Sequence, residues 1–310
     1  MDQCTRWDIY TMGDLNVDLI VPGVTRLPPP GTEQMIDGME THVGGGAALF
    51  SMGCATLGMQ VAFQGIVGND LYGTYLLGKM EKAGVDLSCL RRTDERNTGI
   101  SISFTDEKDR CFVTDWGTNH LVSIRELQMD QAKKARHLHL TGYHGKDHDA
   151  WLDVLTRAHG AGLSVSLDTG WDPEERWSDG LFELLPMTDI LLMNETECLH
   201  YTGAKTAEDG AAILSGVAGM AVIKLGKRGA MVCKKGQILH APGFPMRAVD
   251  TTGAGDSFNA GFVSYYLGGH PLQECLRAGN ACGGLSVTRR GGHAGFPDRV
   301  LLETFLSSHR

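Results

Sequence analysis

The chain has 310 residues, 42% of them hydrophobic and 21% charged, and a formal net charge of −9. This length allows one large α/β domain or two smaller ones, and the composition is that of an ordinary folded protein. A nucleic-acid partner usually requires a basic face, but no run of Lys or Arg exceeds two residues, so we expect no nucleic-acid partner. The 41 glycines and only 10 prolines are typical of an α/β enzyme with many tight turns.

The features that mark secreted or membrane proteins are missing from the sequence. Residues 1–10 lack the apolar core of a signal peptide, and no apolar run approaches the roughly 20 residues that span a bilayer. The eight cysteines are scattered without a Cys-x-x-Cys pair, which favours reduced thiols over disulfides or a structural zinc site. We therefore expect a cytoplasmic protein without a membrane partner.

The first part of the chain predicts strands and two helices, interrupted by a proline-rich break at residues 27–31. Alternating or continuous apolar patterns indicate strands, and helical spacing with terminal glycines indicates helices. The expected strands are 9–12, a segment after Gly13, 35–43, 99–104 and 110–114, and the expected helices are 44–58 and 71–84. A polar turn at residues 106–109 separates the last two strands.

After residue 124 the pattern alternates between helix and strand. The expected helices are 125–135, 147–159 and 207–217, and the expected strands are 137–140, 163–167, 190–193 and 221–225. Such alternation predicts a three-layer αβα fold with a mostly parallel central sheet. Two extended segments, about 15–43 and 97–117, do not fit that sheet. We expect them to form a small β-sheet lid on a single domain that spans residues 1–310.

A glycine-rich turn that opens into a helix-like run is the most informative motif in the chain. Gly253, Ala254 and Gly255 are small enough for backbone to approach an anion closely. Such a helix start aims unpaired N–H groups and a positive dipole at one point, which makes an anion hole suited to phosphate. Asp256 stands beside it and can accept a hydroxyl proton during phosphoryl transfer. A glycine-rich loop capped by aspartates is the alternative interpretation.

The complete string of residues 250–258, Asp-Thr-Thr-Gly-Ala-Gly-Asp-Ser-Phe, resembles the second signature of the ribokinase-like (PfkB) carbohydrate kinase family. This resemblance covers nearly the whole chain and implies an ATP-dependent kinase that phosphorylates a hydroxymethyl group of a small sugar. It further implies that Asp250 and Thr252 help to bind a monovalent cation such as K⁺. In members of this family the lid often pairs with a second subunit, so the resemblance implies a homodimer.

A second motif, Asn-Glu-Thr-Glu at residues 194–197, follows the expected strand 190–193. Ligands bind at the carboxyl ends of parallel strands in open α/β sheets, and oxygen-bearing side chains there can hold Mg²⁺ through its waters. A capped helix with an acidic first turn is the alternative. Beside the 250–258 string, this motif resembles the N-x-x-E motif of the family, which implies that Asn194 and Glu197 support the nucleotide and Mg²⁺.

The acceptor site is expected near the first strand and the first helix. In a strand, Asp14, Asn16 and Asp18 point the same way and can grip sugar hydroxyls, although an exposed strand edge would show the same pattern. The resemblance implies that Asp18, with Asn16, holds the acceptor, and that Gly44 and Gly45 let backbone approach it.

One residue of this first-helix region departs from the family pattern. Relatives carry Asn where this chain has Leu49, which removes one polar contact to the acceptor. The identity of the sugar therefore cannot be carried over from the family.

Two further segments are candidates for the nucleotide site. Lys224 leaves a strand just before Gly226, where it can reach nucleotide phosphates or lie solvated at the strand end. The segment that begins at Asn280 and runs to residue 292 resembles the family's wall beside the adenine and the cation. We expect Lys224, Gly226 and Asn280 to belong to the ATP site.

The acceptor itself stays open between several classes. A nucleoside would need an aromatic wall such as Phe104, Phe112 or Trp116, whereas a 2-keto-3-deoxy sugar acid or a phosphosugar would need fixed cations, for which Arg110 is one candidate. A catalytically silent sugar-binding regulator is the alternative outside the enzymes. Loss of Asp256 would have favoured it, and Asp256 is present.

Two other features are expected to be structural. The residues 137–148 contain four histidines without an His-Glu-x-x-His arrangement, so we do not expect a catalytic zinc. Asp168 ends a strand on the expected active side, where we favour a plain turn over a contact to substrate or to metal-bound water.

Overall fold

The computed structural model of the protein describes residues 6–24, 27–105, 110–172, 175–177 and 180–309, without the side chains of Thr105 and Arg110. A large sheet of eight strands forms the centre, in the order β14-β13-β12-β11-β10-β9-β1-β4. Its strands are β1 (Trp7–Met12), β4 (Val61–Gln64), β9 (Ala135–Thr141), β10 (Ser164–Asp168), β11 (Ile190–Asn194), β12 (Ala221–Lys224), β13 (Ala230–Lys234) and β14 (Gln237–Ala241).

The six strands from β12 to β4 are parallel, and β13 and β14 add an antiparallel edge. Successive side chains of a strand point to opposite faces of the sheet. In β11, Leu191 and Met193 enter one apolar core, while Ile190 and Leu192 enter the other. This burial on both faces explains why the strand is a continuous apolar run in the sequence.

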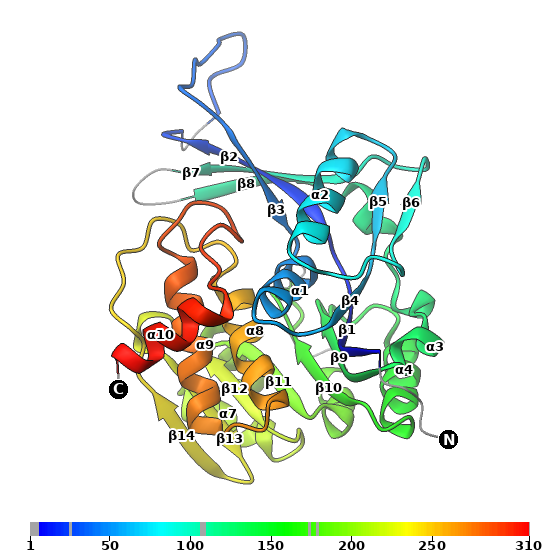
Figure 1. The fold of residues 1–310 in the computed structure, drawn as a ribbon, viewed down its shortest axis with the longest axis vertical. Coiled ribbons are helices and arrows are strands. Elements are labelled where there is room, and N and C mark those ends of the chain that lie inside the picture. Colours follow the sequence, from blue (N-terminus) through cyan, green and yellow to red (C-terminus); the bar gives the residue numbers. More distant parts are fainter. Residues whose placement is uncertain (1–5, 25–26, 106–109, 173–174, 178–179, 310) are drawn as a thin grey trace.

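Helices cover both faces and give the expected three-layer αβα architecture (Figure 1). The first core lies under α3 (Met129–Ala132), α4 (His148–Gly160), α5 (Leu181–Leu184), α6 (Glu195–Thr202) and α7 (Ala207–Ser215). The second lies under α1 (Gly46–Thr56), α8 (Ala254–Leu267) and α9 (Leu272–Ser286), and α10 (Arg299–Ser308) packs on α9. The mostly parallel sheet predicted from the alternating pattern is thereby confirmed.

A small four-stranded sheet lies across one end of the molecule, at the top of Figure 1. Its order is β3-β2-β7-β8, from β2 (Asn16–Pro22), β3 (Glu40–Gly44), β7 (Gly99–Thr105) and β8 (Arg110–Asp115). One face packs its apolar side chains, such as Leu19 and Ile102, near α2 (Leu71–Lys82). The pair β5 (Ile66–Gly68) and β6 (Arg91–Thr93) continues beside it.

Three sequence expectations differ from the structure. The expected helix 125–135 is a 3₁₀ turn and the short α3, because the backbone is extended at Leu127 and the Gln128 N–H donates to Gln64 Oε1 at 2.9 Å. The expected strand 35–43 begins only at Glu40, since the exposed Met35 and Met39 have no strand beside them. The antiparallel strands β13 and β14 were not predicted. The expected turn at 106–109 lies outside the described residues.

Candidate active site

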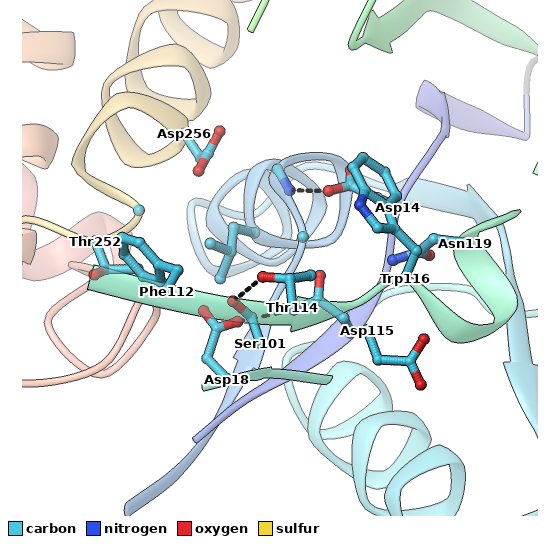
Figure 2. A pocket seen from close by; sticks show the side chains of 15 residues that line it. Asp14, Asp18, Ser101, Phe112, Thr114, Asp115, Trp116, Asn119, Thr252 and Asp256 are labelled. Carbon is cyan, nitrogen blue, oxygen red and sulfur yellow. Dashed lines mark hydrogen bonds between the residues drawn. The ribbon is translucent and has the colours of Figure 1, made fainter. Parts of the chain in front are cut away.

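A pocket of about 310 Å³ opens between the small sheet and the starts of α1 and α8 (Figure 2). Its lining comes from β2 and the turn before it, from the first turns of α1 and α8, and from the small sheet. The lining residues are Asp14, Asn16, Asp18, Gly45, Gly46, Leu49, Ser101, Phe112, Thr114, Asp115, Trp116, Asn119, Thr252, Gly253 and Asp256. Segments far apart in the sequence therefore meet where polar side chains were expected to bind an acceptor.

The start of α8 forms one wall of this pocket. Gly253 is the residue before the first turn and has a left-handed backbone with φ of 72°, a conformation that favours glycine. A Cβ at this position would collide with the carbonyl oxygen of Gly292. The first N–H groups of a helix lack intrahelical acceptors, so the turn through Ala254 and Gly255 directs a positive dipole end toward the pocket.

Replacing Gly253 with Ala should displace this turn. The left-handed backbone costs a non-glycine residue about 1–2 kcal/mol, and the collision with Gly292 adds to this cost. We expect kcat to fall by about a hundredfold, the scale seen when one oxyanion donor is lost. Gly269→Ala at the other end of α8 is the matched control, since its φ is 79° and no atom lies within 4 Å of the added Cβ. Equal kcat values for the two variants would contradict the assignment.

The carboxylate of Asp256 lies between the first turns of two helices. It belongs to the first turn of α8, and a Cβ on Gly46 at the start of α1 would stand 3.3 Å from its Oδ1. Burial, and secondarily the charge of Asp168, raises the pKa of Asp256 to about 7, against the opposing effect of Lys224. A carboxylate whose pKa lies near neutral pH can both take up and release a proton there.

On the other side of the pocket, Asn16 and Asp18 of β2 form a pair. Asn16 Nδ2 donates to Asp18 Oδ1 at 2.8 Å, and burial raises the pKa of Asp18 to about 7. A Cβ on Gly44 would collide with the Asp18 carboxylate, so glycine is required for this close approach. Gly45 follows with φ of 97°.

Asp14 positions the first turn of α1 against the same pocket. Its two carboxylate oxygens accept the N–H groups of Gly46 and Ala47 at 3.0 and 3.1 Å. Asn119 similarly accepts the N–H of Leu15 at 3.1 Å. From the sequence, Asp14 was expected to grip sugar hydroxyls, whereas in the structure its carboxylate binds the start of α1. Asn119 was not identified from the sequence.

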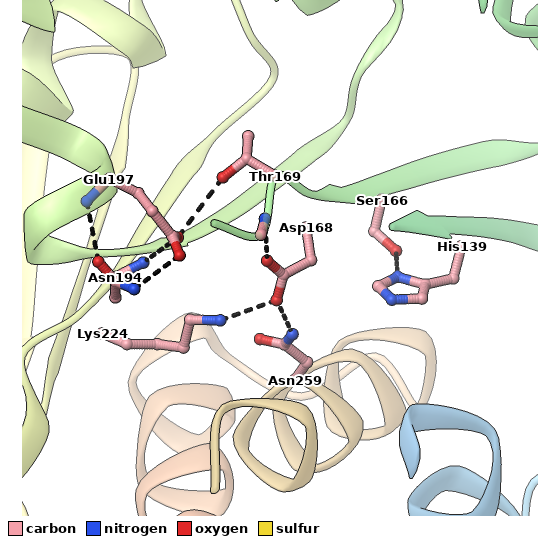
Figure 3. A network of polar contacts seen from close by, with 9 residues as sticks. His139, Ser166, Asp168, Thr169, Asn194, Glu197, Lys224 and Asn259 are labelled. Atoms are coloured by element: carbon pink, nitrogen blue, oxygen red, sulfur yellow. Dashed lines mark hydrogen bonds and ion pairs between the residues drawn. The ribbon is translucent and has the colours of Figure 1, made fainter. Parts of the chain in front are cut away.

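A buried polar network lies behind the start of α8 (Figure 3). Asp168 Oδ2 accepts from Lys224 Nζ at 2.8 Å and from Asn259 Nδ2, and its Oδ1 accepts from the Gly170 N–H at 3.1 Å. The side chains of Lys224 and Asp168 are only 15% and 10% exposed. Lys224 is therefore not a solvated strand end, and Asp168 is more than a plain turn.

This network touches the anion-hole turn. A Cβ on Gly255 would lie 3.4 Å from Lys224 Nζ. Burial acts to raise the pKa of Asp168, but the Lys224 ammonium, together with the Asn259 hydrogen bond, holds that pKa below its ordinary value. The pair thus stays ionised, and its ammonium adds a fixed positive charge beside the turn.

Asn194 and Glu197 cap α6 reciprocally. The Glu197 N–H donates to Asn194 Oδ1 at 2.9 Å, and Glu197 accepts from the Asn194 backbone and side chain at 2.8 and 2.6 Å. Burial and then Asp168 raise the pKa of Glu197. The capping interpretation therefore holds, and a contact of this pair to Mg²⁺ stays a prediction. Within the described residues, no three His, Cys, Asp or Glu side chains gather closely enough to bind a metal ion directly.

The remaining predicted site residues lie around the start of α8 and beyond the pocket. Asp250 accepts the N–H groups of Thr252 and Gly291 at 2.9 Å each. Asn280 donates its side-chain amide to two backbone carbonyls at the end of β14, at 2.9 and 3.2 Å. Gly226 begins a 3₁₀ turn after β12 with φ of 59°. Their assignment to cation or nucleotide stays a prediction.

Several pocket residues were not identified from the sequence. Ser101 and Thr114 face the pocket from β7 and β8, but short polar residues in alternating strands give no sign of which face lines a pocket. Of the three aromatic candidates, Phe112 and Trp116 line the pocket and Phe104 does not. The side chain of Arg110 lies outside the described residues.

The histidines of residues 137–148 do not form a metal site within the described residues. His137 and His139 are buried in the sheet, where both bond to Ser166 at 2.7 Å. Burial lowers the pKa of each to about 3, so both are neutral and structural.

Comparison with known proteins identifies one family for this chain. The model of the pfkB family carbohydrate kinases matches residues 8–299, so the chain belongs to this family. An uncharacterized sugar kinase of Archaeoglobus fulgidus is 34% identical over 80% of this chain and 100% of its own length. The 2-dehydro-3-deoxygluconokinase of Bacillus subtilis is 32% identical over 83% of this chain and 84% of its own.

Solved structures give the same result. A putative ribokinase II of E. coli, in complex with ATP and Mg²⁺, superposes with a TM-score of 0.87 at 25% identity. The match covers 98% of this chain and 100% of that one. The protein is thus a carbohydrate kinase, a phosphotransferase with an alcohol group as acceptor. None of the described helices is long and apolar enough to cross a membrane.

Proposed function

We propose that this kinase transfers the γ-phosphate of ATP to a hydroxymethyl group of a small sugar. The observation that carries the proposal is the position of Asp256, which faces the pocket from the first turn of α8 opposite Asn16 and Asp18. In this arrangement Asp18 and Asn16 hold the acceptor hydroxyls. Asp256 takes the proton of the attacking hydroxyl, which then attacks the γ-phosphorus as the bond to ADP breaks.

The helix start stabilises the transferring phosphoryl group. The amides of Gly253, Ala254 and Gly255 face the charge that develops on its oxygens, and the buried Lys224 beside Gly255 strengthens the positive potential. Closure of the small sheet over the pocket would exclude water and so limit wasteful hydrolysis of ATP. We assign the nucleotide side to Asn194, Lys224, Gly226 and Asn280.

Two metal ions belong to this proposal. The E. coli structure contains ATP and Mg²⁺, which supports the proposal that this kinase also uses ATP with Mg²⁺. Mg²⁺ prefers oxygen ligands and keeps its waters. The side-chain oxygens of Glu197 and Asn194 already accept N–H groups from one another's residue, which fits contact through metal-bound water. Bound Mg²⁺ would shield the phosphate charges. Asp250 and Thr252 are the proposed residues for a monovalent cation such as K⁺.

A coupled assay of acceptor-stimulated ADP release tests the proposed function. The panel should contain pentoses, hexoses, nucleosides, sugar acids and phosphosugars, each with Mg²⁺ and with or without K⁺. We expect turnover with at least one acceptor that carries a hydroxymethyl group, and a product phosphorylated at that group by ³¹P NMR. ADP release that no acceptor stimulates would refute the proposal.

A nucleoside acceptor is the second candidate, and one observation favours it. Phe112 and Trp116 line the pocket, and these residues are 49% and 46% exposed. Aromatic rings of this kind can stack on a base or cover the apolar face of a sugar. The same assay separates the two candidates.

We further propose a cytoplasmic homodimer that forms through the small sheet. The described residues 27–39 before β3 project from the body (Figure 1) and expose large apolar side chains, among them Met35 at 82% and Met39 at 53%. We expect sedimentation velocity at micromolar concentration to give a dimer, and Met35→Glu combined with Met39→Glu to shift it to a monomer. Leu71→Glu, at an 89% exposed residue of α2, is the control that should stay dimeric. A monomeric wild-type protein would contradict the proposal.

A further inference from the structure

A row of polar side chains crosses the inner face of the small sheet. Asp18 of β2 pairs with Ser101 of β7, and Ser101 pairs with Thr114 of β8. The two hydroxyl oxygens lie 2.9 Å apart, and all three side chains line the pocket (Figure 2). Because strand pairing sets their spacing, the row presents donors and acceptors at fixed positions.

The opposite face of the same strands fixes the orientation of this row. Val17 and Leu19 flank Asp18 in β2, and both are buried in the apolar core that α2 shares. Ile100 and Ile102 flank Ser101 and pack, partly buried, against the same core. A one-residue slip would bury the polar row and expose these apolar side chains. The strand register therefore holds the polar row on the pocket side of the sheet.

The charge of the pocket is one-sided. Four of its lining residues are Asp14, Asp18, Asp115 and Asp256, and within the described residues no Lys, Arg or His lines it. Lys224, whose ammonium lies beside Gly255, does not line the pocket and forms an ion pair with Asp168. A carboxylate or phosphate on the acceptor would meet like charges at short range, which costs several kcal/mol in complexes of proteins.

The uncharged groups of the pocket are suited to a neutral acceptor. A carboxylate accepts bonds from hydroxyls, and Ser and Thr hydroxyls both donate and accept, so the row matches an acceptor rich in hydroxyl groups. Leu49, Phe112 and Trp116 add apolar surface, which suits the C–H faces of a sugar ring or the plane of a base.

We propose that the acceptor is an uncharged polyol, a free sugar or a nucleoside, and that Ser101 and Thr114 select it by hydrogen bonding to its hydroxyls. This inference rests on the proposed kinase activity. It separates this chain from enzymes that phosphorylate sugar acids or phosphosugars, although a kinase named for a sugar acid is among its relatives.

The first test compares matched neutral and anionic acceptors. The neutral sugars ribose and fructose are compared with the anionic acceptors ribose 1-phosphate and 2-keto-3-deoxygluconate, respectively. Adenosine and inosine serve as neutral nucleosides, and kcat/KM is measured for every acceptor. We expect the best neutral acceptor to exceed every anionic one by at least a hundredfold. Preference for an anionic acceptor would overturn the inference and leave the kinase activity standing, whereas no turnover with any acceptor would refute the activity and the inference together.

The second test probes the two hydroxyl groups. Ser101→Ala and Thr114→Val should each raise KM for the neutral acceptor about tenfold, the effect of one lost hydrogen bond, with kcat and the KM for ATP nearly unchanged. Val113→Ala is the control, because this half-exposed side chain lies on the same strand and outside the pocket lining. An unchanged acceptor KM in both hydroxyl variants would overturn the assignment.

Discussion

An Asp256→Asn variant should fold and bind ATP, yet lose about a thousandfold in kcat. The amide has the same shape but cannot accept the proton of the attacking hydroxyl, and general-base catalysis contributes on this scale. Steady-state kinetics with a productive acceptor and isothermal titration with ATP measure the two properties separately. Activity above a tenth of the wild-type value would show that another group acts as the base.

The pH profile supplies an independent readout of the same residue. Because the pKa of Asp256 is raised to about 7, its carboxylate is protonated in acid, so kcat/KM of the wild-type enzyme should fall as pH drops below about 7. Asp18 has its pKa raised to the same range, so Asp18→Asn is the control, and its acid limb should persist.

Stability should change in the opposite sense from activity. A carboxyl whose folded pKa lies above its unfolded value makes the folded state less stable as pH rises through that range, since the buried group must then ionise. Asp256→Asn removes this cost, so the variant should melt no lower than wild type at pH 8. A clearly lower melting temperature would indicate that the substitution disturbs α8.

A Lys224→Met variant should lower both stability and activity strongly. The side chain would leave the Asp168 carboxylate buried without its cation, and breaking a buried ion pair from one side costs about 3–5 kcal/mol. The start of α8 would also lose the positive charge that lies beside Gly255. Urea denaturation and kcat are the two measurements.

Three companion variants make this second test specific. Lys205→Met, at an exposed lysine, should change neither quantity. The double variant Lys224→Met with Asp168→Asn should regain much of the stability, because no unpaired charge remains buried, without regaining kcat. Lys224→Arg keeps the charge and should fall between wild type and Lys224→Met in both measurements. Full activity of Lys224→Met would rule out a role for the ammonium in the phosphate site.

The sequence predicted the parts of the fold that depend on local pattern. The strands β9 and β10 alternate apolar with polar residues and β11 is a continuous apolar run, and each ends within one or two residues of its expected bounds. The start of α8 was recognisable because Gly253, Ala254, Gly255 and Asp256 form an uninterrupted string. Both features involve neighbours in the sequence, where periodicity and short motifs are informative.

Contacts between distant segments could not be derived in this way. Asp168 and Lys224 are 56 residues apart, and only the parallel packing of β10, β11 and β12 brings them together. The row of Asp18, Ser101 and Thr114 depends on the register of three strands, which no local pattern specifies. At Asn194 the sequence left capping and metal support open, because one geometry satisfies both.

Residues 290–291 connect the small sheet to the residues just before α8. Glu40, at the start of β3, forms an ion pair of 2.7 Å with Arg290, and the neighbouring Gly291 donates its N–H to Asp250. The same β3 pairs with the strand that carries Asp18. If the small sheet tilts when an acceptor binds, this series of contacts would carry the movement to the start of α8, and we expect the acceptor and ATP to bind with synergy.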